Sequence, residues 1–320
     1  MTITDVPPLG DFVHPAVFYG SDQEYLDLLV PFVLDGLAHG RPVAAAVPGP
    51  RLALLREALG ERAADVLLLD MSVEGRNPGR IIPAVLRRFA DSHPGTHVHI
   101  IGEPIWAGRS DTEYPACAQH EALINLAFAG RDLTIACPYD TVRLADHVLA
   151  DALATHPLVW DATRRYDSEH FAPDVVVDRH NRPITPTPDA TALDVTATTG
   201  VREARRLATR EAERHGLPAE QVANFALITT ELVTNSLRHT DGGCRLTVWR
   251  DDHHVVCTVE DSGRLTDPLA GRRPAGPDRE GGRGLLVVNM LADLVRTHTR
   301  PDGTTVHALV RLPDDGSPRR

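Results

Sequence analysis

The chain has 320 residues, of which 42% are hydrophobic, and it carries a formal net charge of -11. This length and composition predict roughly two globular domains, each with its own core. The spread of acidic residues disfavours nucleic-acid binding through a broad basic face. All 33 residues counted as Lys or Arg are Arg. P-loop and Schiff-base chemistries, which need a lysine, are therefore excluded.

The sequence gives no sign of export or of membrane insertion. It contains no run of about 18 apolar residues, and its start has no basic segment followed by an apolar stretch. The four cysteines, Cys117, Cys137, Cys244 and Cys257, form no C-x-x-C pair and are expected as buried free thiols. We therefore expect a cytoplasmic protein with no direct contact to nucleic acid or membrane.

Short apolar runs alternate with amphipathic stretches from residue 13 to about residue 154. Buried strands are expected at 13–19, 42–47, 66–70, 98–102 and 133–137, and helices at 21–39, 77–92, 111–129 and 140–154. This alternation predicts an α/β fold, with a mostly parallel sheet and helices on both faces. Ligands of such sheets bind beyond the carboxyl ends of the strands.

Tyr19, Glu103, Trp106 and Tyr139 lie at those strand ends and are candidates for a small-molecule sensory pocket, with core packing as the alternative. His14 and Cys137 have the ligand types of a metal pair. No third ligand lies within sequence reach, so a core role is favoured for both.

Several short pieces of this region resemble one known family: His14, Glu103-Pro-Ile-Trp106, Glu121 with Asn125, and Cys137-Pro-Tyr-Asp140. They are similar to the methanogen/methylotroph sensory domain found ahead of bacterial signalling modules. The resemblance implies a RecA-like α/β domain over residues 1–178 that lacks a phosphate loop and senses an unknown small molecule.

Residues 179–192 hold three prolines in six residues and no apolar period, which predicts an extended, semi-rigid linker. Beyond it we expect strands at 193–197, 244–250, 254–260, 296–299 and 304–312, and helices at 201–215, from 218 to about 240, and at 284–295. This order predicts an α+β two-layer sandwich over residues 193–313, with three helices on one face of a mixed sheet. Residues 314–320 form a tail.

The second of these helices carries polar residues that an amphipathic helix does not need. Glu231, Asn235 and His239 follow one another at intervals of four, so they lie on one stripe. The buried face is expected from Ala226, Leu227, Leu232, Val233 and Leu237. A carboxylate beside an amide oxygen suits proton acceptance and Mg²⁺ binding, with a solvated helix face as the alternative.

Two later stretches favour a ligand site. An alternating strand ends in Asp261-Ser-Gly263, where a glycine lets a ligand approach the backbone. Gly282-Arg-Gly284 directly precedes an apolar helix and would present backbone N–H groups to phosphate. Thr304 then opens the last strand.

The order E-x-x-x-N, D-x-G, G-x-G and G-T resembles the Bergerat-type (GHKL) ATPase superfamily, and His239 after Asn235 makes it similar to the anti-sigma-factor serine kinases. The resemblance implies ATP and Mg²⁺ as cofactors. Asp261 and Gly263 would bind adenine, Asn235 would ligate Mg²⁺ and Glu231 would be the catalytic base. It also implies phosphate binding by Gly282, Arg283, Gly284 and His239, and closure of the adenine pocket by Thr304.

The resemblance implies a protein serine/threonine kinase in signal transduction and transcription regulation, which binds a sigma factor or phosphorylates an anti-anti-sigma (STAS-type) antagonist. The proline-rich linker and the single helix before the Glu231 helix leave no acceptor hairpin of a sensor histidine kinase. Three alternatives stay open: a nucleotide-dependent binding switch without phosphate transfer, a histidine kinase with an unrecognised acceptor, and a metabolic enzyme using the first domain. A homodimer is also left open.

Overall fold

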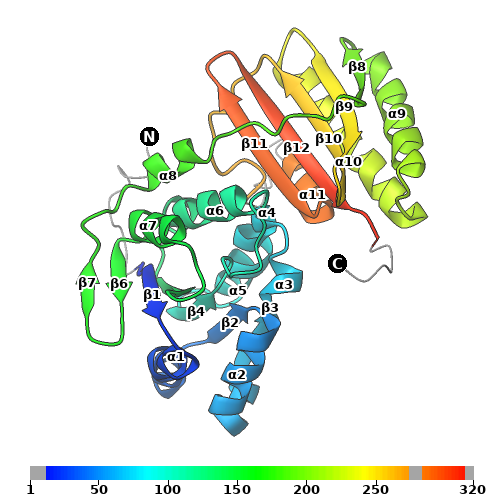
Figure 1. The fold of residues 1–320 in the computed structure, drawn as a ribbon. Helices are drawn as coiled ribbons and strands as arrows, with labels where there is room; N and C mark the ends of the chain where they lie inside the picture. Colours follow the sequence, from blue (N-terminus) through cyan, green and yellow to red (C-terminus); the bar gives the residue numbers. More distant parts are fainter. Residues whose placement is uncertain (1–11, 274–282, 314–320) are drawn as a thin grey trace. The chain divides into compact units, whose positions relative to one another are not determined.

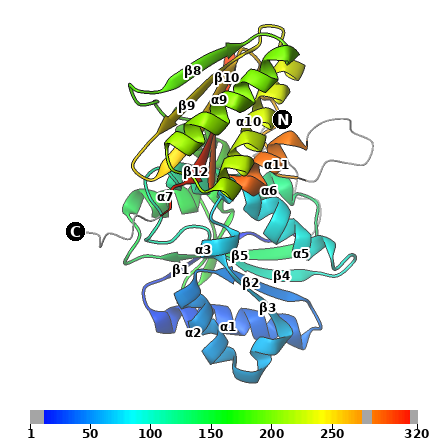
Figure 2. The same cartoon turned by 90° about the vertical axis from the view of Figure 1, so that its right-hand side faces the viewer.

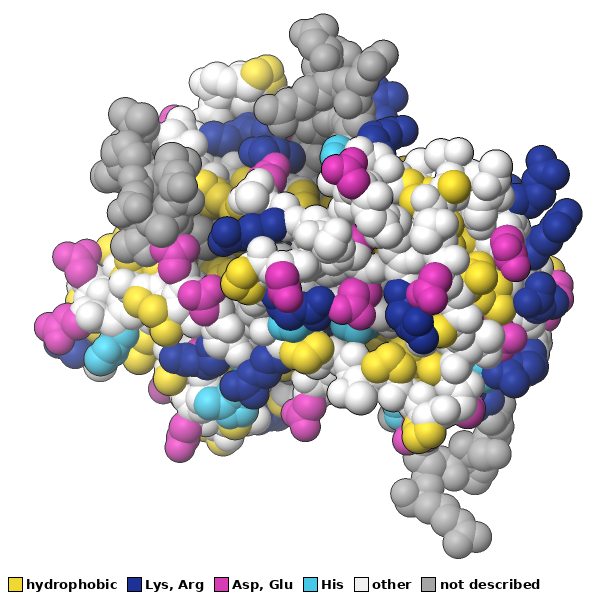
Figure 3. All heavy atoms as spheres, turned by 90° about the horizontal axis from the view of Figure 1, so that it is seen from above, with side chains coloured by type: hydrophobic (Ala, Val, Ile, Leu, Met, Phe, Trp, Pro, Cys, Tyr) yellow, Lys and Arg dark blue, Asp and Glu magenta, His cyan; other side chains and the backbone are white. Residues whose placement is uncertain are grey.

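The chain divides into two compact units, Met1–His180 and Asn181–Arg320 (Figure 1). The computed structural model describes residues 12–273 and 283–313. No helix within these ranges is both long and apolar enough to cross a membrane. On the face drawn in Figure 3, acidic and basic side chains are interspersed.

The first unit contains a seven-stranded sheet in the order β3-β2-β4-β5-β1-β6-β7. The strands are β1 (Pro15–Tyr19), β2 (Val43–Val47), β3 (Val66–Asp70), β4 (Val98–Gly102), β5 (Leu133–Asp140), β6 (Leu158–Trp160) and β7 (Arg165–Asp167). The strands from β3 to β6 in this order pair in parallel, and β7 pairs antiparallel with β6. β2 is buried along its whole length, as expected for a strand covered on both faces.

Helices cover both faces of this sheet, which confirms the predicted α/β fold. They are α1 (Asp22–Ala38), α2 (Gly49–Leu59), α3 (Met71–Glu74), α4 (Pro78–Arg80), α5 (Arg88–Asp91), α6 (Tyr114–Ala127), α7 (Asp146–Thr155) and α8 (Pro173–Arg179), with the short helical segments η1 (Gly60–Asp65) and η2 (Ile81–Arg87). Figure 2 shows α1 and α2 on one face and α5 and α6 on the other. α1 is capped by Ser21, whose hydroxyl accepts from the Glu24 amide.

Two helix predictions in this unit need correction. The helix expected at 77–92 is interrupted by the π-helical segment η2, which contains Pro83; a proline has no N–H to donate and crowds the preceding turn. The helix expected from residue 140 begins only at Asp146. β5 continues to Asp140 because Phe18 and Tyr19 of β1 pair with its last two residues.

The second unit contains a five-stranded sheet in the order β11-β12-β10-β9-β8. The strands are β8 (Thr191–Val195), β9 (Cys244–Arg250), β10 (His254–Asp261), β11 (Leu294–Arg300) and β12 (Gly303–Arg311). Every pair in this order is antiparallel, so the predicted mixed sheet is wrong. The helical segments are η3 (Thr198–Gly200), α9 (Val201–Arg214), α10 (Ala219–His239) and α11 (Gly284–Leu291).

A single core joins the long helices to one face of this sheet, which confirms the predicted two-layer α+β sandwich. Val255, Cys257 and Val259 alternate along β10 and pack in the same cluster as Phe225 and Leu232 of α10. Two details differ from the sequence prediction. The last helix ends at Leu291, and Val295 belongs to β11. Leu227 is 41% exposed, because successive residues of a helix are rotated by about 100° about its axis and Leu227 therefore points away from the buried side of Ala226.

The first residues of the predicted linker lie against the second sheet. The Asn181 side chain donates to the Thr299 carbonyl at 2.8 Å and accepts from the Thr299 amide at 2.9 Å. β11 is an edge strand, so the Asn181 side chain pairs with backbone groups of Thr299 that a neighbouring strand would otherwise pair. The Ile184 amide donates to Nε2 of His307 at 3.3 Å. The segment is therefore held on β11 and β12 over its first residues.

Candidate functional site

Helix α10 positions the polar stripe predicted for the second unit. Its buried side chains are Val222, Phe225, Ala226, Ile228, Thr229, Leu232, Val233 and Ser236. Because these recur every three or four residues, one face of the helix packs on the sheet. Glu231 and Asn235 are half-buried at the margin of that face, and His239 is exposed at the last residue of the helix.

Asp261, the last residue of β10, is held by two hydrogen bonds. The Ser236 hydroxyl donates to Oδ2 at 2.5 Å, and the Gly263 amide donates to Oδ1 at 2.8 Å. A carboxylate has about four acceptor positions, so Asp261 keeps a fixed orientation and further capacity to accept from a ligand. Sequence reasoning missed Ser236. Its spacing of four and three residues from the buried Leu232 and Val233 is the signal that places it toward the sheet.

Thr304 lies beside Asp261, because the two residues are register partners in β12 and β10. Its hydroxyl donates to the Gly263 carbonyl at 2.7 Å and accepts from the Leu265 amide at 3.1 Å. A Cβ on the preceding Gly303 would lie 2.5 Å from the Asp261 carbonyl oxygen, so only glycine fits there. The fold therefore brings Asp261, Gly263 and Thr304 together, with the Thr304 hydroxyl holding the turn that follows Asp261.

Glu231 and Gly284 form a second close approach. A Cβ on Gly284 would lie 2.9 Å from Oε2 of Glu231, so the absence of a side chain lets the start of α11 reach this carboxylate. A negative charge at a helix N-terminus is favourable, because the first N–H groups of the helix are unpaired. Ser236 lies five residues beyond Glu231 on α10, about 7.5 Å along the axis at about 1.5 Å per residue.

The other predicted nucleotide ligands are less defined. Asn235 directly precedes Ser236, and Arg283 is exposed directly before Gly284. Gly282 lies outside the described residues. The imidazole of His239 is exposed, whereas its backbone carbonyl oxygen would lie 3.7 Å from a Cβ on Gly263. The roles of these residues toward a nucleotide remain predictions.

In the first unit, two of the predicted pocket residues are in contact. Tyr19 donates from its hydroxyl to Oε1 of Glu103 at 3.4 Å, and both side chains are buried. Burial raises the pKa of Glu103 to about 8, against the opposing effect of the Arg51 charge. The Arg51 guanidinium lies over the rings of Tyr19, at 5.0 Å, and Tyr25, at 4.9 Å. A protonated carboxyl group, two phenols and a cation therefore gather at the carboxyl ends of β1 and β4.

Trp106 and Tyr139 have other neighbours. The Arg109 guanidinium lies 3.9 Å from the centroid of the Trp106 ring, and it also donates to the Pro104 carbonyl at 3.0 Å. Trp106 is thereby held within its own loop. Tyr139 is buried, with its ring edge-on to that of His156 at 5.5 Å. Whether these residues line one sensory pocket with Tyr19 and Glu103 remains a prediction.

Comparison with protein families gives one match for each unit. Residues 13–157 match the MEthanogen/methylotroph, DcmR Sensory domain (MEDS), and residues 195–309 match the histidine kinase-like ATPase domain. These two matches confirm the resemblances to the methanogen/methylotroph sensory domain and to the Bergerat-type ATPase superfamily. A comparison with curated proteins found no match.

Solved structures with similar parts include three from different organisms. The RsbU and RsbW domains of Rv1364c from Mycobacterium tuberculosis share 20% identity over 40% of this chain and a third (33%) of that chain, with a TM-score of 0.30. The SiaB-SiaC complex from Pseudomonas aeruginosa shares 11% sequence identity over 38% of this chain and 88% of that chain, with a TM-score of 0.32. Flagellar accessory protein FlaH from Methanocaldococcus jannaschii shares 10% sequence identity over 48% of this chain and 71% of that chain, with a TM-score of 0.31. Likenesses at these TM-scores support no argument about function.

Proposed function

Because the chain joins a MEDS sensory domain to a histidine kinase-like ATPase domain, we propose that it is an ATP-dependent protein serine/threonine kinase of the anti-sigma-factor type. A small molecule bound by the first domain would control it. Its partners would be a sigma factor or a STAS-type antagonist in the cytoplasm. The observation that carries this proposal is the fixed Asp261 carboxylate at the end of β10, beside the helix that presents Glu231 and Asn235.

The residues around Asp261 fit an adenine base. Its carboxylate would accept from the exocyclic amino group, and the Ser236 and Gly263 donors fix its orientation before the base arrives. Gly263 carries no side chain between the base and the backbone. Thr304 would contribute by holding the turn at Gly263 and Leu265. Preorganised polar groups of this kind reduce the free energy that binding must spend on ordering.

The residues around Gly284 fit phosphate groups. The start of α11 offers backbone N–H groups, and Arg283 adds a cation; Gly282 and His239 are the further candidates. When bound, Mg²⁺-ATP supplies the phosphoryl group, and the metal neutralises its negative charge. Asn235 would ligate that metal through its amide oxygen, one residue before Ser236 on α10.

Glu231 would act on the serine or threonine hydroxyl of the protein substrate. Its carboxylate lies at the start of α11, beside the proposed phosphate position, where it would orient the hydroxyl and accept its proton. Phosphoryl transfer depends mainly on positioning and electrostatics. Loss of this carboxylate should therefore remove transfer and leave ATP binding largely intact.

The test compares Glu231→Gln with the matched control Glu220→Gln, an exposed glutamate in the first turn of the same helix. ATP affinity is measured by calorimetry, and transfer by radiolabel passing from ATP to a serine of a STAS-type antagonist. We expect Glu231→Gln to lose about 10²–10⁴-fold in transfer rate, the usual contribution of a general base, with ATP affinity little changed. Glu220→Gln should behave like the wild type.

Other outcomes separate the alternatives. ATP binding without transfer to any antagonist would overturn the kinase assignment and leave a nucleotide-dependent binding switch. Acid-labile phosphate on the chain itself would indicate a histidine kinase. A wild-type chain that binds no ATP would refute the proposal altogether.

A further inference from the structure

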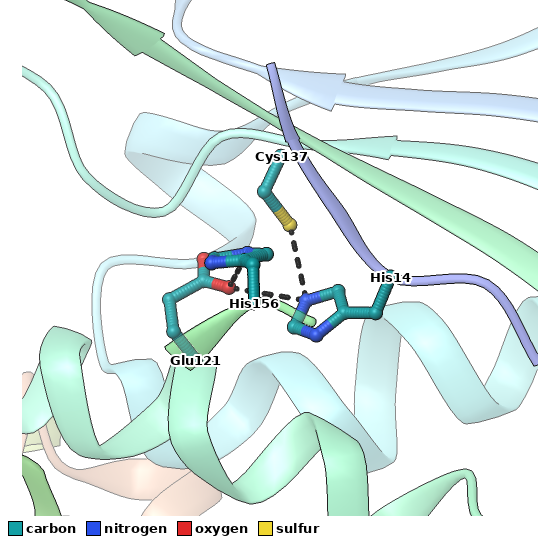
Figure 4. A group of neighbouring side chains, drawn as sticks. All are labelled: His14, Glu121, Cys137 and His156. Carbon is teal, nitrogen blue, oxygen red and sulfur yellow. Dashed lines mark hydrogen bonds and ion pairs between the residues drawn. The ribbon is translucent and has the colours of Figure 1, made fainter. Parts of the chain in front are cut away.

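Four buried side chains of the first unit converge on one point (Figure 4). They are His14 before β1, Glu121 on α6, Cys137 on β5 and His156 at the end of α7. Their exposures are 0%, 0%, 1% and 0%. One ligand atom from each lies within 4.8 Å of all the others. Each of these residue types is a metal ligand.

Three of the distances between these ligand atoms are close to those between the ligands of a small ion. Oε2 of Glu121 is 3.4 Å from Nε2 of His14 and 3.2 Å from Nε2 of His156. Sγ of Cys137 is 3.5 Å from Nε2 of His14. Ligands at about 2.0–2.3 Å from a zinc-type ion in a tetrahedron lie roughly 3.3–3.8 Å from one another. The three observed distances are close to that range.

Asn125 fixes the orientation of His14. The Asn125 side-chain NH₂ donates to the carbonyls of Thr155, at 2.8 Å, and Ala122, at 3.2 Å. Its amide oxygen therefore faces Nδ1 of His14, at 3.1 Å. Because that oxygen can only accept, Nδ1 carries the hydrogen, and the neutral imidazole presents the lone pair of Nε2 to the cluster. An outer hydrogen bond of this kind is what orients metal-binding histidines.

His156 is fixed in the same way. Its Nδ1 lies 2.8 Å from the Ala152 carbonyl oxygen, which can only accept, so Nδ1 is the donor, and in the neutral imidazole Nε2 carries the lone pair. Nε2 faces Glu121, as Figure 4 shows. In their neutral forms, both histidines thus direct the lone pair of Nε2 toward the carboxylate.

With both histidines neutral, the Cys137 thiol can donate to Nε2 of His14, and Glu121 accepts from neither histidine. Both carboxylate oxygens of Glu121 and Nε2 of His156 are buried without a hydrogen-bond partner among the described residues. A buried carboxylate without a donor or a counter-charge is strongly destabilising. A cation between the four atoms would remove that cost.

We propose that His14, Glu121, Cys137 and His156 bind a divalent transition-metal ion of the zinc type. Two neutral imidazoles, one thiolate and one carboxylate give a site that a divalent ion makes neutral. The thiol proton of Cys137 leaves to solvent when the ion binds. Sulfur and nitrogen ligands favour Zn²⁺, Co²⁺ or similar ions over Mg²⁺ and Ca²⁺, which prefer oxygen. Sequence reasoning favoured a core role for His14 and Cys137, because it could not see that α6 and the end of α7 supply the other two ligands.

The test uses the full chain, with metal content measured after expression in zinc-containing medium and after removal and replacement with Co²⁺. We expect one tightly held ion per chain. The Co²⁺ form should show the visible bands of four-coordinate cobalt and the near-ultraviolet charge-transfer band of a thiolate ligand. Neither readout depends on ATP or on kinase activity.

Cys137→Ser should lose the charge-transfer band, and the matched control is Cys117→Ser, a buried cysteine one turn before Glu121 on α6. Glu121→Gln keeps the side-chain shape and should weaken retention against a chelator by at least about 10-fold, the lower bound for loss of a supporting contact. Should Cys137→Ser fail to fold, the charge-transfer band of the wild type still shows whether a thiolate binds the ion, and its persistence in Cys117→Ser shows that this thiolate is not Cys117. Substoichiometric metal in the wild type, or a charge-transfer band that survives in a folded Cys137→Ser variant, would overturn the proposal.

Discussion

Glu103 illustrates how burial of a single residue links stability to pH. Burial raises its pKa to about 8 from an ordinary value of 4.5. The folded chain therefore binds a proton that the unfolded chain has lost between pH 4.5 and 8. The contribution of this group to the free energy of unfolding is fully present below pH 4.5, and it is lost as the pH rises through this window. The charge of Arg51 opposes the shift without cancelling it.

Glu103→Gln should remove this pH dependence. The glutamine oxygen can still accept from Tyr19, and its NH₂ replaces the protonated oxygen, so the packing is kept. Relative to the variant, the wild type should lose roughly 3 kcal/mol of unfolding free energy between pH 4.5 and 7. Denaturant unfolding at a series of pH values measures the difference, with the exposed Glu57→Gln as control. A difference that does not change with pH would contradict the prediction.

Three strands of the second sheet share a hydrogen-bonded chain that reaches the segment after α8. The Trp249 indole on β9 donates to the Thr258 hydroxyl on β10 at 3.1 Å, and Nδ1 of His307 on β12 lies 3.0 Å from that oxygen. Nε2 of His307 accepts from the Ile184 amide. His307 is therefore neutral in this arrangement, and burial lowers its pKa to about 4, assisted by the Arg296 charge.

Acid should weaken this part of the sheet. The folded His307 has a pKa of about 4 and the unfolded residue one of 6.5, so the unfolded chain binds the extra proton between these values. The contribution of His307 to the free energy of unfolding is fully present above pH 6.5. The free energy of unfolding falls by up to roughly 3 kcal/mol as the pH drops toward 4. Unfolding of the second unit is followed by the fluorescence of Trp249, with Trp106 and Trp160 replaced by Phe. The His307→Gln variant should lose this dependence of the unfolding free energy on pH, and the variant His253→Gln, at an exposed residue, should keep it. An equal pH dependence in both variants would refute the assignment to His307.

Elements with a strong local pattern were predictable from the sequence, whereas the ends of some of them were not. The expected strands at 66–70 and 98–102 have the observed limits, because each is a short apolar run between more polar residues. The apolar run from Leu285 to Val295 has no Gly or Pro to end its helix. Only the pairing of Val295 with Ala308 assigns its last part to a strand. The antiparallel pairing of the second sheet is likewise a tertiary property.

The same limit applies to the two sites. The spacing of Glu231, Asn235 and His239 is local, so one helix places all three on a stripe. The contact of Ser236 with Asp261 joins a helix to a strand, and no spacing in a single sequence encodes it. The cluster around Cys137 draws its side chains from four separate segments. Its ligand set became visible only when the fold brought these segments together.

At the scale of the whole chain, each unit has its own hydrophobic core. Val17, Leu29 and Val43 belong to a core of the first unit, whereas the core of the second unit contains Phe225 and Cys257. Separate cores favour separate unfolding transitions. A ligand that binds one folded unit stabilises that unit, by about 2.7 kcal/mol at 100 times its dissociation constant.

We therefore expect two calorimetric transitions that respond to different ligands. Mg²⁺-ATP should raise the transition of the second unit, and the Asn235→Ala variant should lose this response. Removal of the proposed metal should lower the transition of the first unit, and Cys137→Ser should already show the lower value. Linkage is reciprocal, so any effect of ATP on the affinity for the sensory ligand would equal the effect of that ligand on ATP affinity. Identical shifts of both transitions with ATP would contradict independent unfolding and would indicate that the sensor and the ATPase are coupled.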